Sequence, residues 1–260
     1  MGLSDRLGAT VASAEADGAT LGVAIVSPEG ERFSHNGQRR FVAASTVKIA
    51  IMVELFRRID AGEMTPDDLH VLLAEEQANG SGVLRHLHAG LTPTLGDLAY
   101  LMMSISDNTA TNILIDRLGI ARIQATMRAL GMQNSTLGRR MHGRPALPEE
   151  ADNWAVPDEY AAMIAAILQG RAASQASCEH MVALLELQQN DRRIARHLPR
   201  TDRPRWGTKT GSLPDVANDV GFVITARGPL ILAIFTRDVA DPHQAEAVIG
   251  DVARAAFGAV

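Results

Sequence analysis

The spacing of apolar residues changes along the chain, and each spacing predicts a kind of element. Positions 3–16 carry apolar residues at roughly helical spacing, and positions 20–27 (TLGVAIVS) read as a strand that can pair with 31–35 across the turn Pro28-Glu29-Gly30. The middle of the chain is mostly helical. Helices are predicted at 48–59, 120–131, 157–168 and 178–187, and a helical pattern covers 65–122 with breaks at 79–82 and 104–109.

The C-terminal third changes character, because three strands are predicted in succession at 205–211, 216–225 and 230–237, followed by a helix at 242–257. Strands, then helices, then strands again is an α+β pattern. We expect an antiparallel β-sheet, made of the first hairpin and the last three strands and flanked by helices, plus an all-helical subdomain. The chain is interpreted as a single domain over 1–260, with an α/β part of 1–44 and 190–260 and a helical subdomain of about 45–189.

Composition and charge narrow the range of partners. The chain has 260 residues, 46% of them hydrophobic, and a formal net charge of −5, so neither nucleic acid nor an anionic membrane is expected as the main partner. The six arginines within 192–205 are interpreted as a solvated surface. Cys178 is the only cysteine, which excludes an intrachain disulfide and a thiolate metal cluster. We expect a small-molecule substrate, no metal and no cofactor.

The N-terminal residues MGLSDRLGATVASAEADG show no basic segment followed by an apolar core, so they do not read as a signal peptide. No apolar run approaches the ~20 residues that a membrane-spanning helix needs. The expectation is therefore a cytoplasmic protein for the chain as given, and a periplasmic or secreted one if its N-terminus was trimmed.

Only two of the twenty-five basic residues are lysines, Lys48 and Lys209. Lysine, unlike arginine, can lose its proton when it is buried or lies near another cation. Ser45 precedes Lys48 by three residues at a predicted helix start, so the amine can reach the serine hydroxyl. A serine hydroxyl is a weak nucleophile that needs an adjacent base. Ser45 and Lys48 are therefore a candidate nucleophile and base.

Two further triplets complete a set with the Ser45-Thr46-Val47-Lys48 segment. Ser106-Asp107-Asn108 follows Ser45 by 61 residues in a loop between helices, and Lys209-Thr210-Gly211 follows it by 164 residues on a predicted strand. Each motif alone is weak. In this order, Ser-x-x-Lys, Ser-Asp-Asn and Lys-Thr-Gly are typical of class A β-lactamases and penicillin-binding proteins.

The chain resembles that superfamily over nearly its whole length. The segments FVAASTVKIAIMVELF, LGDLAYLMMSISDNTATNILIDRLG and GTKTGSLPDVANDVGFV are similar to it beyond the three motifs. The resemblance implies an antiparallel sheet flanked by helices, an all-helical subdomain, and a site between the two. It also implies a serine hydrolase that acylates Ser45, that Lys48 activates Ser45, and that Ser106 relays a proton to the leaving nitrogen.

The resemblance further implies a set of substrate-binding groups. Asn108 would bind the substrate amide and help to hold Lys48, and Lys209 with Thr210 would bind the substrate carboxylate. The backbone N–H groups of Ser45 and Ser212 would form the oxyanion hole. Gly211 would keep the strand edge free for the substrate, because a side chain there would block it.

The loop before Pro157 departs from the family pattern, in which a glutamate activates the water that releases the acyl group. The family spacing from Ser106 leads to His142, which is not a carboxylate. Glu149 and Glu150 have the right chemistry at the wrong spacing and are interpreted mainly as solvated charges. His142 has an ordinary pKa of about 6.5, which suits a general base.

A second departure follows the Lys-Thr-Gly motif. The family often carries an arginine on the next strand, whereas this chain has Asn218 and Asp219, and we expect Asp219 to repel a carboxylate. Three functions stay open. The first is a class A β-lactamase-type hydrolase; the second is a cytosolic esterase, amidase or peptidase with the same nucleophile. The third is a non-catalytic sensor of β-lactams or peptidoglycan fragments.

Overall fold

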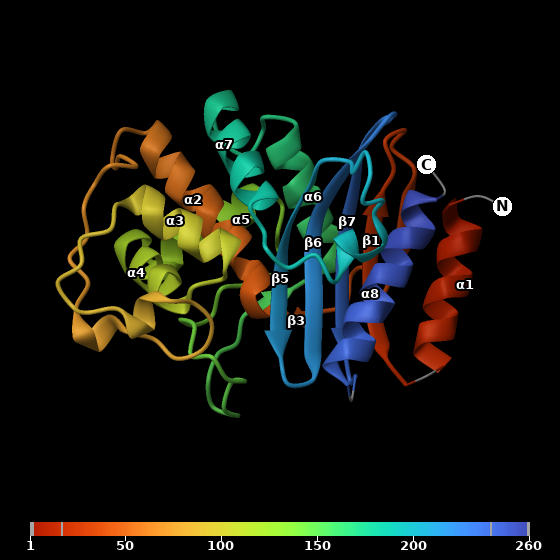
Figure 1. Ribbon diagram of the computed structural model, residues 1–260, viewed down its shortest axis with the longest axis horizontal. Helices are drawn as coiled ribbons and strands as arrows, with labels where there is room; N and C mark the ends of the chain where they lie inside the picture. Colours follow the sequence, from red (N-terminus) through yellow and green to blue (C-terminus); the bar gives the residue numbers. More distant parts are fainter. Residues whose placement is uncertain (1–2, 17, 240, 259–260) are drawn as a thin grey trace.

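The computed structural model describes residues 3–16, 18–239 and 241–258, and one five-stranded antiparallel sheet lies at the centre of this part of the chain (Figure 1). Its strand order is β2-β1-β7-β6-β5. The predicted pairing of the first hairpin with the last three strands is confirmed, and so is the α+β class. The strands are β1 (Thr20–Val26), β2 (Arg32–His35), β5 (Trp206–Leu213), β6 (Val216–Thr225) and β7 (Gly228–Arg237).

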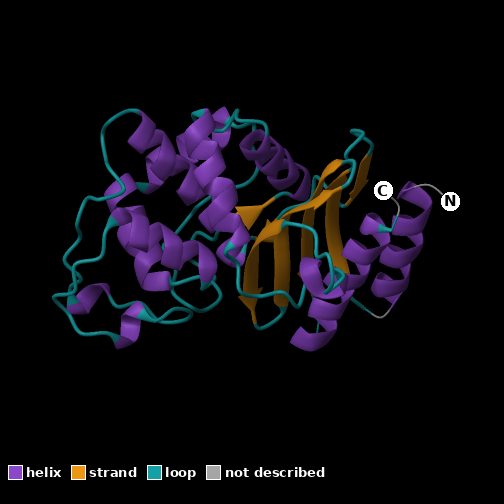
Figure 2. Ribbon diagram, turned by 45° about the horizontal axis from the view of Figure 1, so that its top comes forward, coloured by secondary structure: helices purple, strands orange, loops and turns teal. Residues whose placement is uncertain are grey.

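Both faces of the sheet are covered, which explains why its central strands are apolar almost throughout. In β1, Leu21, Val23 and Ile25 share one core with α1 (Leu3–Ala16) and α8 (Pro242–Phe257). The side chain between the last two, Ala24, belongs to the core on the opposite face. This alternation is the two-residue period of a strand. Figure 2 shows α1 and α8 together on one side of the sheet and the larger helical part of the molecule on the other.

The second face carries α6 (Pro157–Leu168) and α7 (Gln175–Glu186). Tyr160 of α6 meets Phe235 of β7 edge-on, with ring centroids 5.5 Å apart. Pro157 stands in the first turn of α6, where a missing backbone N–H costs nothing. The other helices gather beyond the edge strand β5 (Figure 1); they are α2 (Lys48–Asp60), α3 (Leu95–Ser104), α4 (Asn108–Leu118) and α5 (Ile120–Ala129).

Most predicted helices are confirmed, but the helical pattern assigned from position 65 onward is wrong up to α3. Residues 61–94 contain only two short 3-10 turns, η2 (Ala74–Glu76) and η3 (Leu84–His86). Extended stretches pair there instead: Leu72 N donates to Leu91 O, and His70 N donates to Pro93 O. Several apolar side chains that suggested a helix face outward, among them Leu69, which is 61% exposed, whereas Leu72 is buried in the core.

The long loop predicted at 138–156 is confirmed except at its end. There a two-residue strand, β4 (Trp154–Ala155), pairs antiparallel with β3 (Phe41–Val42). This pairing joins the loop to the segment directly before Ser45. None of the helices in the described part of the chain combines the length and apolar content that crossing a membrane requires.

Candidate active site

Ser45 lies in η1 (Ala44–Val47), a 3-10 turn that leads directly into α2. The segment directly before this turn is held by two hydrogen bonds. Ala43 N donates to Asn153 O of the loop at 2.8 Å, and Asn218 Nδ2 of β6 donates to Val42 O at 2.9 Å. Ala44 has a φ of 46°, a strained value for an alanine. The fold therefore holds Ser45 at a constrained turn where loop and sheet meet.

Strand β5 runs close beside this turn, and Gly211 allows the approach. A Cβ on Gly211 would lie 2.9 Å from Ala43 O and 3.2 Å from Ser45 N. The structure therefore gives a reason for glycine at this position that does not involve the substrate: a side chain would meet Ala43 and the turn that carries Ser45. Its predicted effect on substrate binding stays a prediction.

The Ser-Asp-Asn triplet divides its side chains between two tasks. The Asp107 carboxylate accepts from Ala110 N and caps α4, and it also accepts from Val83 N and Leu84 N at 2.6 and 2.9 Å. Asp107 therefore fixes the start of α4 against the 83–84 segment. Ser106 has a φ of 60°, and this left-handed residue precedes the turn into α4. Ser106 and Asn108 meet Lys48 instead.

Lys48 is completely buried, and its ammonium group uses all three of its donors. Nζ donates to Ser106 O at 2.7 Å, to Ser106 Oγ at 2.9 Å and to Asn108 Oδ1 at 2.8 Å. Asn108 is held from its other end, where Nδ2 donates to Asn79 O. The predicted meeting of Lys48 with Ser106 and Asn108 is therefore present, across 58 and 60 residues of sequence.

Burial and the nearby charge of Lys209 lower the pKa of Lys48 well below its ordinary value, and the Asp107 carboxylate only partly opposes them. A lysine of this kind reaches the neutral amine form more readily than an exposed one. Ser45 lies three residues before it in the turn. In the described part of the chain Lys48 donates no hydrogen bond to Ser45 Oγ, because its three protons are used elsewhere.

Lys209 lies in the middle of β5 and is also completely buried. Nζ donates to Thr210 O at 3.0 Å. Burial lowers the pKa of Lys209 to about 7, although the Asp219 carboxylate acts against this shift. Burial raises the pKa of Asp219 to about 6, although Arg193 favours its charged form. Lys48, Lys209 and Asp219 are thus all buried, and the charge of Lys209 acts on Lys48 while that of Asp219 acts on Lys209.

Asp219 does not face the cleft as a repelling charge, so that expectation is wrong. It is buried, accepts from Ile194 N at 3.1 Å, and lies near the guanidinium of Arg193. Asn218, its neighbour, turns to the segment before Ser45 instead. Asp219 is hidden from a bound ligand by its complete burial.

Arg193 is the residue that the sequence reasoning missed. It is only 4% exposed, which contradicts the interpretation of 192–205 as an entirely solvated surface. Arg193 Nη1 donates to Gly211 O and Asn218 O at 2.8 and 2.7 Å, and Nη2 donates to Ser212 Oγ at 2.6 Å. Arg193 supplies a cation next to β5, whereas the following strand, β6, carries no arginine. Its position among five other arginines gave no signal of burial.

Two adjoining hollows meet at Ser45, Ser81 and Ser212. The first is bounded by Asn108 and the loop residues 139–144 and 152–153. The second is bounded by Ser104–Ser106, the polar segment 188–192 and Thr210. Ser45 therefore lies between a loop-lined space and a space lined by Ser106 of the Ser-Asp-Asn motif and Thr210 of the Lys-Thr-Gly motif.

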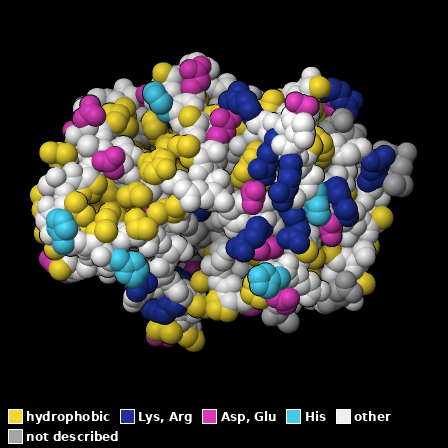
Figure 3. Space-filling view, viewed as in Figure 1, with side chains coloured by type: hydrophobic (Ala, Val, Ile, Leu, Met, Phe, Trp, Pro, Cys, Tyr) yellow, Lys and Arg dark blue, Asp and Glu magenta, His cyan; other side chains and the backbone are white. Residues whose placement is uncertain are grey.

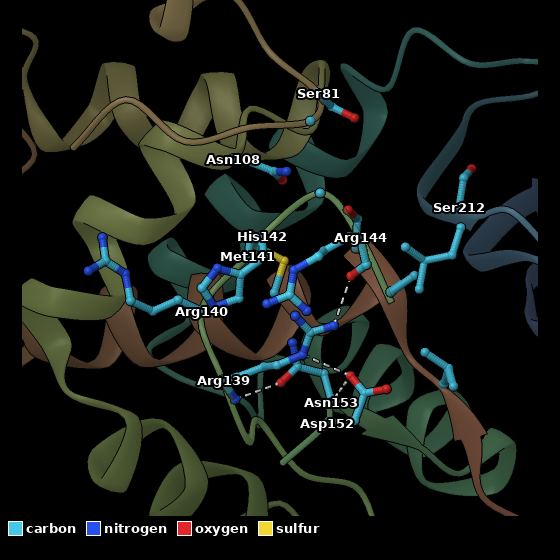
Figure 4. A pocket seen from close by; sticks show the side chains of 16 residues that line it. Ser81, Asn108, Arg139, Arg140, Met141, His142, Arg144, Asp152, Asn153 and Ser212 are labelled. Atoms are coloured by element: carbon cyan, nitrogen blue, oxygen red, sulfur yellow. Dashed lines mark hydrogen bonds and ion pairs between the residues drawn. The ribbon is translucent and has the colours of Figure 1, made fainter. Parts of the chain in front are cut away.

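Ion pairs organise the loop that walls the first hollow. Arg139 Nε donates to Asp152 Oδ1 at 3.1 Å, and its backbone N donates to Asn153 Oδ1 (Figure 4). Arg140 pairs with Asp116 of α4 at 3.1 Å. A second clamp comes from Asn112, which donates to Met141 O at 2.9 Å and accepts from Met141 N at 2.8 Å. These contacts give an irregular segment a defined path.

The three candidates for water activation occupy different places. Glu150 is held by two hydrogen bonds of 2.7 Å from Arg144, which lower its pKa to about 2. Glu149 is exposed, and neither glutamate lines the hollows around Ser45. His142 does line the first hollow together with Ser45, beside Met141 in Figure 4. Partial burial and then the charges of Arg139 and Arg144 lower the pKa of His142.

The sheet, the buried lysines and the serine turn define a serine acyl-transfer site of the Ser-x-x-Lys type. The model of the beta-lactamase enzyme family matches residues 3–260, and the chain belongs to that family.

Individual relatives, known from solved structures or from sequence, are similar to the chain over most of its length. A β-lactamase from Sphaerobacter thermophilus is 55% identical, with a TM-score of 0.95 over 97% of this chain and 96% of that one. The penicillin-binding protein PBP-A is 25% identical at a TM-score of 0.88, over 98% and 96%. The β-lactamase BRO-1 of Moraxella catarrhalis is 23% identical over 88% of this chain and 73% of its own length.

Proposed function

We propose that the protein is a class A β-lactamase-type serine hydrolase, which opens a β-lactam or a related amide by forming an acyl-enzyme at Ser45. The observation that carries this proposal is the buried contact of Lys48 with Ser106 and Asn108, next to the turn that holds Ser45. Membership of the beta-lactamase enzyme family over 3–260 supports the same substrate class.

In the acylation step, neutral Lys48 accepts the Ser45 hydroxyl proton while Ser45 Oγ bonds to the carbonyl carbon. The lowered pKa of Lys48 favours this role. The backbone N–H groups of Ser45 and Ser212 stabilise the oxyanion. When the C–N bond breaks, the proton passes from Lys48 through Ser106 Oγ, 2.9 Å away, to the leaving nitrogen.

Lys209 and Thr210 bind the substrate carboxylate, and Arg193 supports that site from below through Ser212 Oγ. Asn108 binds the amide of the acyl side chain. Lys209 and Thr210 belong to β5 and Asn108 begins α4, whereas Arg193 directly precedes the 3-10 turn Ile194–His197, so most of these groups lie on regular elements of the fold.

Release of the acyl group requires a base for water, and we assign it to His142. His142 lines the same hollow as Ser45, whereas Glu150 is held by Arg144 and its pKa of about 2 makes it a weak base. The lowered pKa of His142 keeps its imidazole neutral at pH 7. Water gives one proton to His142 and its oxygen to the acyl carbon. When the bond between that carbon and Ser45 Oγ breaks, the proton passes from His142 to Ser45 Oγ and restores the hydroxyl.

One observation favours a second candidate, a penicillin-binding function with slow release. Among the described residues that line the first hollow, the only carboxylate is Asp152, and Arg139 already pairs with it. A site that acylates readily but lacks a strong base would accumulate the acyl-enzyme. The esterase or amidase alternative differs only in substrate and uses the same nucleophile.

Turnover of the chromogenic cephalosporin nitrocefin tests the proposal. The wild type is expected to hydrolyse it, and Ser45→Ala is expected to lose turnover and the covalent adduct seen by mass spectrometry. Ser81→Ala is the matched control, since Ser81 lines both hollows as Ser45 does and has no assigned role in the chemistry. Adduct without turnover would support the second candidate, and equal activity of Ser45→Ala and the wild type would reject both.

A further inference from the structure

Four arginines between positions 192 and 203 surround a third hollow, separate from the two hollows at Ser45. Arg192, Arg196, Arg200 and Arg203 line it together with Asp191, Ala195 and Leu198. Figure 3 shows basic side chains gathered in a band over the half of the molecule that holds β6 and α8. Asp191 and Arg192 also line the hollow that contains Ser45 and Thr210. The arginine hollow therefore adjoins the candidate active site.

Two of these arginines are held by contacts that do not neutralise their positive charge. The stem of Arg196 lies against Gly250 of α8, where a Cβ would come within 2.6 Å of Arg196 Cδ. The guanidinium of Arg203 lies over the ring of Trp206, 5.2 Å from its centroid. Side chains fixed in this way lose less conformational entropy when they bind a ligand.

The positive charge of the hollow is only partly neutralised. Arg203 approaches Asp191 and Arg192 approaches Glu246, each at 3.4 Å. Within the described residues, Arg196 donates only to a backbone oxygen, that of Arg192, and Arg200 makes no hydrogen bond or ion pair. Four guanidinium groups thus meet two carboxylates. Guanidinium groups bind phosphate and carboxylate through paired hydrogen bonds.

We propose that this arginine hollow binds a multiply charged anionic group, phosphate or clustered carboxylate, of a ligand that extends from the cleft past Arg192. The polar segment 188–192 lines the hollow that contains Ser45, and its last two residues, Asp191 and Arg192, also line the arginine hollow. The proposal that the arginine hollow binds an anion does not depend on the proposed function. The proposal that this anion is part of the ligand in the cleft rests on the proposed function. The protein would accordingly prefer substrates with an acidic group distant from the scissile bond.

Calorimetry with inorganic pyrophosphate tests the binding site. The wild type is expected to bind it, and the double variant Arg196→Gln/Arg200→Gln is expected to bind about tenfold more weakly, with a shallower salt dependence. Arg171→Gln/Arg227→Gln removes the same charge outside the hollow and is expected to bind like the wild type. No binding by the wild type, or an equal loss in both double variants, would overturn the proposal.

A second arm identifies the source of the anion. Acylation by a cephalosporin with an acidic C3 substituent is compared with acylation by a neutral analogue. If Arg196→Gln/Arg200→Gln slows only the acidic compound, the anion belongs to the cleft ligand. If both compounds react as with the wild type while pyrophosphate binding is weakened, a free anion is the ligand and the extension from the cleft is overturned. If Ser45 is not acylated at all, the proposed function fails, and the pyrophosphate arm still decides on the site.

Discussion

The two walls of the cleft are built in opposite ways. On one wall Lys48 and Lys209 are completely buried, and strands or helices of the core carry them. On the other wall, the irregular segment 138–153 is organised by arginine–carboxylate pairs at partly exposed positions, such as Arg144 with Glu150. The first wall holds the groups that would form an acyl-enzyme, and the second faces the water that would release it.

This difference separates the two half-reactions. Burial shifts the pKa values of the lysines by removing them from water, and that shift depends on the whole core. The loop depends instead on a few hydrogen bonds and ion pairs, and the more exposed of these pairs, such as Arg140 with Asp116 and Arg144 with Glu150, each contribute little. We therefore expect substitutions on the buried wall to impair acylation severely, and substitutions in the loop to act mainly on the lifetime of the acyl-enzyme.

Lys48→Met should give the largest effect on the buried wall. Methionine is close to lysine in volume but accepts no proton, so acylation should slow by roughly 10²–10⁴-fold. Stopped-flow measurement of nitrocefin acylation checks this. Arg40→Met, at an exposed arginine that lies over Trp154, serves as the control and should acylate like the wild type. Comparable rates for the two variants would remove Lys48 from the mechanism.

Gly211→Ala tests the close approach of β5 to the serine turn. The new methyl group would meet Ala43 O at 2.9 Å, so the strand or the turn must move. Overpacking of this kind costs about 1–3 kcal/mol of unfolding free energy, and acylation should fall with it. Urea denaturation measures the first effect. Gly8→Ala in α1, where a Cβ meets nothing within 4 Å, should instead stabilise the protein by about 0.5–1 kcal/mol.

The charge state of Lys209 should make both the free energy of unfolding and the KM depend on pH near neutrality. Its pKa is about 7 in the folded protein and 10.5 in an ordinary lysine, so between these values the unfolded chain binds more protons. The free energy of unfolding should therefore rise with pH across that window. Over the same range the substrate carboxylate loses its cation, so KM for nitrocefin should increase above about pH 7. A KM that stays constant up to about pH 9 would show that Lys209 does not bind the carboxylate.

Glu150→Gln should give the smallest effect. Glu150 is bound by Arg144 and does not line the hollows around Ser45. Its loss should leave both acylation and the release of the acyl group unchanged in a single-turnover assay. A large fall in the release rate would make Glu150, and not His142, the base.

The sequence predicted the buried wall well, because its signals are local. Ser45 and Lys48 share one turn, Ser106 and Asn108 flank a helix cap, and Lys209 lies on a predicted strand. The α+β order followed from the same local patterns. Features that depend on distant contacts were missed. Arg193 is buried where its guanidinium donates to Gly211 O of β5 and Asn218 O of β6, and Asp219 is buried where it accepts from Ile194 N, far from it in the sequence.

The helical prediction for the region 61–94 was wrong for a related reason. Its apolar residues have helical spacing, yet residues 70–72 pair with 90–93, and side chains such as Leu69 stay exposed. Spacing alone cannot distinguish an apolar face that meets a core from one that meets solvent.

Rapid-quench mass spectrometry of the wild type and His142→Gln with a penicillin tests the division between the two walls most directly. The predicted result is an adduct on the peptide that contains Ser45, formed at the same rate in both proteins and lasting about 10²-fold longer in His142→Gln. An adduct on another residue, or equal adduct lifetimes in the two proteins, would contradict this account.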